Sequence, residues 1–353
     1  MIIRLVRAGL VAFALIVAIV PLPARLVEAW YSQRLYPAIQ GTLTPISNTT
    51  ALSILDAAVV VLLALLLVVF IRRVRASGFG RAIVRSLIGL VTLSAAIYLL
   101  FLVLWGFNYR RLPLEAKLEF DRGRVTQDAV RRLASHSVRM LNAGHARARA
   151  AIESGDAAGP SLEEAFASAQ RTLGPAPLAI PGIPKRSALQ LYFRVAAIDG
   201  MTDPFFLEIV VNPDALPFER PFITLHEWAH LAGYAHEGEA NFVAWLACTQ
   251  GNDLARYSGW LAIYEHAAAA LPRAERAGLR ATLDPGVLQD LQASAARYAR
   301  STPAVRDAAR DVYDRYLRAN RVEEGIAAYS AVTRLIVGAG LETGEPPRLR
   351  SGG

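Results

Sequence analysis

The sequence predicts a membrane-anchored, mainly α-helical protein with two parts. Three transmembrane helices come first, and an α+β domain with a small sheet and many helices follows. The chain has 353 residues and is 54% hydrophobic, and the hydrophobic excess is concentrated before residue 107. After that point apolar residues recur at helical spacing, and only two short stretches have the composition of strands.

Three apolar runs are predicted to be the transmembrane helices of an anchor at residues 1–107. They lie at about residues 6–23, 52–71 and 87–107. A helix needs about 20 apolar residues to cross a bilayer, and the second and third runs have this length. The first run follows Arg4 and Arg7, as in a secretory signal peptide, but two further runs follow, so we expect an uncleaved anchor. Residues 30–50 are polar and turn-rich and are expected to form a loop.

Arginines set the predicted orientation. The short connection between the second and third runs carries Arg72, Arg73, Arg75, Arg81 and Arg85. The positive-inside rule places this loop in the cytoplasm, and two crossings place the basic N-terminus on the same side. Residues from 108 onward then lie outside the cytoplasm, although Arg110 and Arg111 weakly oppose this orientation.

The overall charge and the single cysteine exclude several kinds of protein. The net charge is +8, which we attribute to arginines beside apolar runs and on surface helices, so no nucleic-acid partner is expected. Cys248 is the only cysteine, which excludes an intrachain disulfide and a zinc site with several cysteines. A lipid bilayer is the partner that the composition favours.

The second part is predicted to be one domain at residues 108–340, with residues 341–353 as a flexible tail. Its longest helix should run from 125 to 155, with Thr126 as N-cap and Gly155 as its end. Further helices are expected at residues 161–173, 220–233, 236–248, 252–271, 273–279, 286–298, 305–319 and 323–337. Residues 189–197 and 205–211 are rich in aromatic and β-branched side chains and are predicted to be strands.

The stretch His226-Glu227-Trp228-Ala229-His230 has the HExxH form and lies in a predicted helix. Positions i and i+4 share one face of a helix, so His226 and His230 can present two imidazoles to one metal ion. Glu227 would face the same ion and could take a proton from a metal-activated water. The motif therefore predicts a Zn²⁺ site with Glu227 as general base.

The third metal ligand has more than one candidate. Residues 226–236 match HExxHxxGxxH, which makes His236 a ligand, but the methionines after residue 125 precede the motif, so a Met-turn is missing. Glu237 and Asn241 offer another arrangement at i, i+4: Glu237 binds the metal, and Asn241 accepts a hydrogen bond from a ligand histidine. Two histidines and one glutamate leave the fourth position open, as in catalytic zinc sites. Glu239 is the remaining candidate.

These segments resemble a known family. Glu237–Asn241 looks like the E-x-x-A-D/N signature of gluzincin metallopeptidases. Trp105–Tyr109 (WGFNY), Asp203–Phe205 (DPF) and the stretch HEWAHLAGYAHEGEANFVAWLA are similar to an uncharacterised bacterial family of membrane proteins, domain of unknown function 3810. The resemblance spans most of residues 100–340. It implies a zincin-like domain in a bacterial inner (cytoplasmic) membrane, with Glu237 as third ligand.

We therefore expect a membrane-anchored zinc metallopeptidase that hydrolyses a peptide or protein substrate. Residues 205–211 could form the cleft edge on which an extended peptide lies. Tyr329 is the first candidate to stabilise the transition state, followed by Tyr316 and Arg321. The alternative is a non-catalytic, zinc-stabilised membrane sensor or assembly protein. The sequence does not indicate a substrate.

Overall fold

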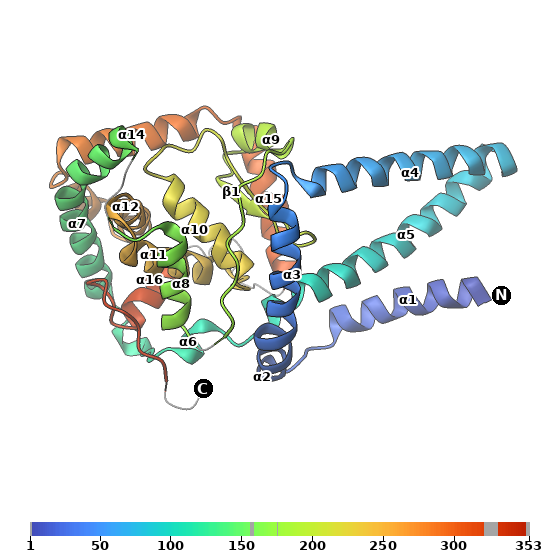
Figure 1. The fold of residues 1–353 in the computed structure, drawn as a ribbon, viewed down its shortest axis with the longest axis horizontal. Helices are drawn as coiled ribbons and strands as arrows, with labels where there is room; N and C mark the ends of the chain where they lie inside the picture. The colour runs from blue at the N-terminus through green and yellow to red at the C-terminus, as the bar shows by residue number, and fades with distance from the viewer. Residues whose placement is uncertain (1, 156–158, 175, 321–330, 351–353) are drawn as a thin grey trace.

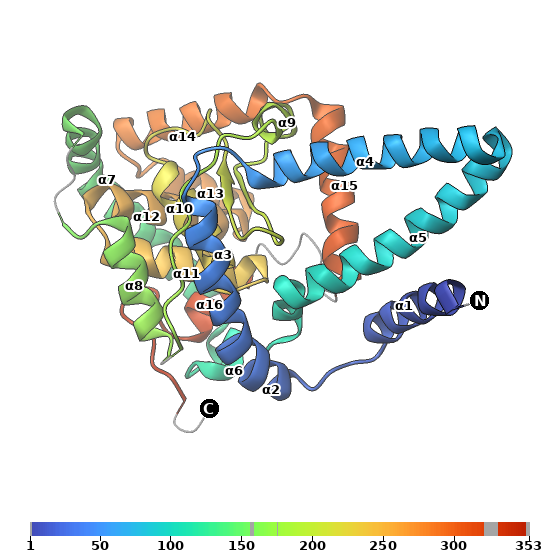
Figure 2. The same ribbon diagram turned by 45° about the vertical axis from the view of Figure 1, so that its right-hand side comes forward.

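The structure is a computed structural model that describes residues 2–155, 159–174, 176–320 and 331–350. Three helices project together from a mainly helical body: α1 (Ile2–Ile19), α4 (Ile54–Ser77) and α5 (Phe79–Leu104) (Figure 1). The N-terminus and the α4–α5 turn both lie at the end farthest from the body (Figure 2). The chain therefore separates into an apolar stalk and a folded domain.

Helices α4 and α5 confirm the second and third apolar runs as candidate membrane spans. Both are long and apolar enough to cross a bilayer, and they form a hairpin that turns at Gly78. No residue of α4 and only Ala82, Phe101 and Leu102 of α5 are buried in the folded chain. Their length and apolar composition are consistent with helices that lie in a membrane.

Helix α1 packs against α5. It qualifies as a candidate membrane span only together with the helical segment that follows it. The pair Arg4–Ile19 and Ala24–Asn48 passes the same test together, with a bend of 108° between them. The break lies at Pro21 to Pro23, where proline cannot continue the hydrogen bonding of a helix. The described part of the chain thus contains two candidate spans, or three if the bent pair is one span.

The expected loop at residues 30–50 is wrong, because this segment is helical. It comprises α2 (Ala24–Leu26), the π-helix η1 (Val27–Leu35) and α3 (Tyr36–Asn48). Its polar side chains bond to the domain rather than forming turns. The Tyr36 hydroxyl donates to the Leu231 carbonyl at 2.8 Å, and the Thr44 hydroxyl donates to the Leu207 carbonyl at 2.9 Å. These contacts hold α3 across the domain surface.

The domain is built around α11 (Glu237–Gln250), whose residues from Glu237 to Cys248 are all buried. A helix that is apolar on all sides must be covered on all sides. The covering helices are α8 (Leu162–Thr172), α10 (Arg220–Leu231), α12 (Asp253–Ala269) and α16 (Ala331–Gly338), and α7 (Gln127–Ser154) packs on α12. Residues that follow the metal-binding motif therefore form the centre of the core.

Most predicted helices are confirmed, including their ends. Thr126 caps α7, Gly155 ends it, and Ser161 forms a capping box with Glu164 at the start of α8. The later helices are α13 (Arg273–Arg280), α14 (Pro285–Ala299) and α15 (Pro303–Ala319), and short helical turns occur at η2 (Gly106–Arg110), α6 (Leu114–Lys117) and η3 (Arg122–Arg124). Of the helix expected at 323–337, α16 forms the last part, and residues 321–330 lie outside the described residues.

The sheet has two strands, but one of them was predicted wrongly. Residues 189–197 form helix α9 (Leu189–Ala196), in which Phe193 and Ala196 share the buried face at helical spacing. The strands are β1 (Gly200–Thr202) and β2 (Ile209–Val211), paired antiparallel with Met201 opposite Val210. Of the predicted strand at 205–211, only the last three residues are extended in the sheet.

The tail predicted at residues 341–353 contacts the domain as far as residue 350. Leu349 forms an antiparallel bridge with Leu118, and the Arg350 amide donates to the Lys117 carbonyl at 2.9 Å. Leu341 is buried. These main-chain contacts, which the polar composition does not reveal, join residues 349 and 350 to the domain. Residues 351–353 lie outside the described part.

Candidate metal centre

Helix α10 presents two imidazoles from one face. His226 and His230 are four residues apart, and their Nε2 atoms lie 3.1 Å from each other with the rings nearly perpendicular. His230 is buried, and His226 is partly exposed. One helical turn therefore brings two potential nitrogen ligands to a single point.

The start of α11 brings a carboxylate to the same point. The chain reverses at Gly233, whose φ of +82° favours glycine and where a Cβ would lie 2.9 Å from Asn108 Oδ1. After this turn, Glu237 Oε2 lies 3.2 Å from His226 Nε2, and Glu237 Oε1 lies 3.6 Å from His230 Nε2. His226, His230 and Glu237 are the group among the described residues that could hold a metal ion.

The spacing of the three groups fits a tetrahedral ion. Metal–ligand bonds of about 2.05 Å in a tetrahedron separate neighbouring ligand atoms by about 3.3 Å. The observed separations are 3.1, 3.2 and 3.6 Å. His230 Nδ1 lies 2.7 Å from the Tyr234 carbonyl, which can only accept, so Nδ1 carries the proton and Nε2 keeps its lone pair for a metal. The donor set fits a zinc ion.

The other candidate ligands lie outside this group. His236 precedes the first turn of α11, and its ring packs edge-on against Tyr109 with centroids 5.8 Å apart. Glu239 is buried and accepts the Leu114 amide at 2.6 Å. Asn241 is buried too, but the acceptor of the hydrogen bond from His230 Nδ1 is the Tyr234 carbonyl. Only Glu237 of these residues reaches the two histidines.

Glu227 lies between the motif helix and the sheet. Its Oε2 accepts the Thr202 hydroxyl at 2.8 Å, and the same hydroxyl is 3.0 Å from the Glu227 carbonyl. A Cβ at Gly200 would lie 2.5 Å from Glu227 Oε1, so strand β1 needs glycine there. Burial raises the pKa of Glu227, and the neighbouring His226 and His230 oppose that rise. A carboxylate with a raised pKa is a stronger proton acceptor.

The ligand group is electrostatically matched. Burial alone would raise the pKa of Glu237, but His230 and His226 outweigh it and hold this pKa well below its ordinary value. Burial lowers the pKa of His230, but in the metal-free site the attraction of Glu237 outweighs burial and raises this pKa to about 9, so a metal that binds Nε2 must displace a proton from it. The carboxylate is therefore ionised at neutral pH and faces both imidazoles.

Sequence reasoning missed Tyr313, whose hydroxyl donates to Glu237 Oε1. Tyr313 lies on α15 and stacks on Tyr316, with ring centroids 6.0 Å apart. Burial raises the pKa of Tyr316 to about 12. The i, i+3 spacing of the two tyrosines places them on one helix face and was the available signal. The other predicted stabilisers, Tyr329 and Arg321, lie outside the described residues.

The other two motifs of the family resemblance, at residues 105–109 and 203–205, lie close to the candidate metal centre. The Trp105 indole donates to the His230 carbonyl at 3.1 Å, and its ring lies 6.2 Å from the His230 ring. Asn108 is buried and accepts the Ser32 hydroxyl at 3.2 Å. Asp203 accepts the amides of Phe205 and Phe206 at 3.1 and 2.7 Å, which closes the turn between the strands. Each motif thus has a structural role near α10.

The model of a family described as "Protein of unknown function (DUF3810)" matches residues 31–337. The chain belongs to this family. The matched range covers α4, α5 and the HEWAH motif of this chain. No curated protein and no solved structure matches the chain.

Proposed function

We propose that this protein is a membrane-anchored, zinc-dependent metallopeptidase that hydrolyses peptide bonds. The convergence of His226, His230 and Glu237 beside the buried Glu227 carries the proposal. When bound, Zn²⁺ would polarise the scissile carbonyl and make a water molecule more acidic. On the same grounds we propose a zincin-like domain of gluzincin type at residues 108–340.

Each side chain at the candidate metal centre has a proposed role that follows from its position. His226, His230 and Glu237 would hold the ion. Glu227, kept in place by Thr202, would accept the proton of the attacking water and pass it to the leaving amine. Tyr313 touches Glu237 and is the described residue best placed to stabilise negative charge on the substrate.

The peptide would lie along β1 rather than β2. The expected cleft edge at 205–211 is not available, because Ile209 pairs with Thr202 on one side and its carbonyl accepts the Lys185 amide at 2.8 Å on the other. Strand β1 is the outer member of the pair among the described residues, and its Gly200 is next to Glu227. An extended peptide added there would pass over the general base.

We further propose that the domain lies outside the cytoplasm at a bacterial inner membrane. The N-terminus and the α4–α5 turn lie at one end of the stalk (Figure 2). The N-terminal segment and the α4–α5 turn both carry arginines, so the positive-inside rule supports a cytoplasmic location for this end of the stalk. The domain at the opposite end would then face the other compartment.

A non-catalytic, zinc-stabilised sensor or assembly protein is less consistent with the site. A structural zinc site normally has four protein ligands, whereas the described residues supply a group of three. A structural site also has no use for Glu227, which is buried beside the ligands at the energetic cost of desolvation.

The test is metal analysis combined with hydrolysis by the Glu227→Gln variant. Purified wild-type protein should contain one zinc per chain and cleave members of a peptide library. Glu227→Gln should keep the zinc and lose about 100- to 10,000-fold in kcat, because general-base catalysis has that magnitude. Glu163→Gln, at an exposed position of α8, is the matched control and should behave as wild type. Wild-type protein without zinc, or an active Glu227→Gln variant, would contradict the proposal.

A further inference from the structure

Exposed apolar side chains are unevenly distributed over the domain. Outside α1, α4 and α5, the large exposed ones among the described residues lie almost entirely in residues 20–52, 178–195 and 298–312. Val125 and Leu349, each 36% exposed, are the exceptions. These segments include α3, α9 and α15, on the side from which α4 and α5 project, whereas α7, α8 and α12 lie on the opposite side (Figure 1). Outside the three projecting helices, the large exposed apolar side chains therefore gather on one side of the domain.

Helix α9 is fixed beside the point where α4 leaves the domain. Asp56, in the first turn of α4, accepts the Ser187 hydroxyl at 2.9 Å and the Ala188 amide at 2.7 Å, just before α9 begins. From this position α9 exposes Leu191 (69%) and Tyr192 (41%) to its surroundings. A helix with such a face next to a membrane span meets the bilayer rather than water.

The length of α5 shows how close the site is to the membrane. Residues 86–104 carry no charged side chain, and at about 1.5 Å per residue they extend about 29 Å. This equals the thickness of the hydrocarbon layer, about 30 Å. The next residue is Trp105, the indole of which donates to the carbonyl of the metal-ligand candidate His230. With residues 86–104 in the hydrocarbon layer, the outer edge of that layer lies at Trp105. The indole of Trp105 contacts His230 of the candidate metal centre.

Helix α15 connects the apolar face directly to the site. Val312 is 67% exposed, while the adjacent Tyr313 reaches Glu237. On the inner side of the helix, Tyr316 packs against Phe101 in the last turns of α5, with ring centroids 6.4 Å apart. One helix therefore touches the membrane span and the metal centre and exposes an apolar residue between them.

We propose that the face formed by α9 and by Val312 of α15 lies in the interfacial layer of the bilayer, and that the metal centre cleaves polypeptides that are themselves held in the membrane. The second statement rests on the proposed peptidase function. The occupant of this face is the lipid surface, because the face is continuous with the two spans that leave the domain there. The substrate class is a membrane-anchored polypeptide, cut close to where it leaves the bilayer.

The membrane contact can be tested without any activity. Leu191→Cys, Val312→Cys and, as control, Glu163→Cys would each be labelled with an environment-sensitive fluorophore in full-length protein reconstituted into vesicles. The native Cys248 is fully buried and should not react. Brominated lipids should quench the labels at 191 and 312 at least about twofold more than the label at 163, as for groups that enter the interfacial layer. Equal quenching at all three positions would overturn the proposal.

The substrate class needs a second measurement. One peptide sequence would be offered to the reconstituted protein in two forms, soluble and attached to a fatty acyl chain in the same vesicles. We expect kcat/KM to be at least about tenfold higher for the anchored peptide, since the membrane raises its effective concentration. Leu191→Glu should reduce this preference and leave cleavage of the soluble peptide unchanged.

The two failures are distinguishable. Absence of zinc, or of hydrolysis of either peptide, overturns the peptidase proposal, and the quenching data still decide the membrane contact. Hydrolysis of both forms at equal kcat/KM overturns the substrate class alone.

Discussion

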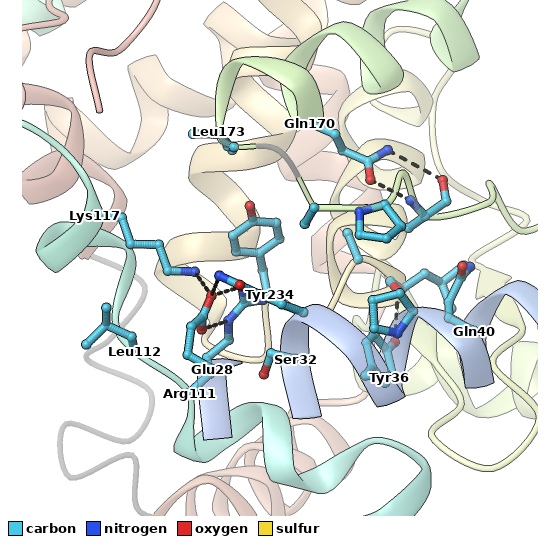
Figure 3. A pocket seen from close by; sticks show the side chains of 18 of the residues that line it. Glu28, Ser32, Tyr36, Gln40, Arg111, Leu112, Lys117, Gln170, Leu173 and Tyr234 are labelled. Atoms are coloured by element: carbon cyan, nitrogen blue, oxygen red, sulfur yellow. Dashed lines mark hydrogen bonds and ion pairs between the residues drawn. The ribbon is translucent and has the colours of Figure 1, made fainter. Parts of the chain in front are cut away.

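Two buried charged clusters lie on either side of the turn that follows the HEWAH motif, and they differ in how their charges are satisfied. The first is the metal group His226, His230 and Glu237. The second, which we call the ion cluster, consists of Glu28, Arg111 and Lys117 and borders a cavity of about 160 Å³ (Figure 3). Both clusters have a glutamate at their centre, and both pack against the segment 231–239.

The ion cluster is closed. Arg111 donates to both oxygens of Glu28 at 3.0 and 3.1 Å, and Lys117 adds a third bond. The remaining Arg111 nitrogen donates to the Gly233 carbonyl at 3.0 Å, and the guanidinium lies 5.0 Å from the Tyr234 ring centroid. Each nitrogen of the Arg111 guanidinium therefore has an acceptor, both Glu28 oxygens are bonded, and the cluster joins Glu28 to the turn at Gly233.

The metal group is open. Two imidazole nitrogens face each other and one carboxylate, and all three are groups that bind zinc. The comparison teaches that burial and charge alone do not indicate a metal site. What separates the two clusters is the kind of group: the ion cluster pairs two cationic side chains with a carboxylate, whereas the metal group brings together two imidazole nitrogens and a carboxylate that can all bind one zinc ion.

The largest expected difference concerns metal removal. Chelation should remove the zinc and destabilise the domain, because an ion that binds only the folded state adds about 4 kcal/mol at 1,000 times its Kd. Glu237→Ala should abolish both the zinc and its effect on thermal unfolding. Glu28→Gln should retain one zinc per chain and the same shift on chelation. The comparison fails if Glu28→Gln also loses the metal, or if chelation leaves the unfolding temperature of wild-type protein unchanged.

Acid unfolding should reveal the ion cluster. Burial would raise the pKa of Glu28, but Arg111 and Lys117 outweigh it and lower this pKa from 4.5 to about 2. A depressed pKa gives stability that is complete above pH 4.5 and is lost as the pH falls toward about 2, at most about 3 kcal/mol here.

The measurement is a pH series of unfolding free energies for wild type and Glu28→Gln, both without metal. The difference between the two proteins should be constant above pH 4.5 and shrink below it. A difference that does not change between pH 5 and pH 2 would show that Glu28 gains nothing from its partners. Chelation of both proteins beforehand keeps the metal centre out of the comparison.

How far the sequence predicts these features depends on whether the signal is local. The HEWAH helix, the caps Thr126 and Ser161, and the two long apolar helices depend on neighbours in the chain, and they were predicted correctly. Residues 30–50 were predicted wrongly because their helix is stabilised by partners such as Leu231, far along the chain.

The candidate site shows the same division. His226, His230 and Glu237 lie within twelve residues, so their convergence could be anticipated. Tyr313 comes from a helix 76 positions after Glu237, and no short motif connects the two. Asn241 has the right spacing for an outer hydrogen bond, but the Tyr234 carbonyl is closer to His230 because the chain turns back at Gly233.

The smallest expected effects come from removing one further hydrogen-bond donor to the glutamate of each cluster. Tyr313 donates to Glu237, as Lys117 does to Glu28. Tyr313→Phe keeps the ring and its stacking on Tyr316 but removes this bond. Because Glu237 is a metal-ligand candidate, loss of its bond with Tyr313 should lower zinc affinity about tenfold, the lower end of the range for groups that orient metal ligands. The free energy of unfolding should change little. Lys117→Met should do the reverse, lowering stability and leaving the zinc Kd unchanged. Competition with a chromophoric chelator measures the Kd, and Tyr316→Phe is the matched control. An equal effect of the two tyrosine variants on zinc affinity would show that Tyr313 acts through packing and not through Glu237.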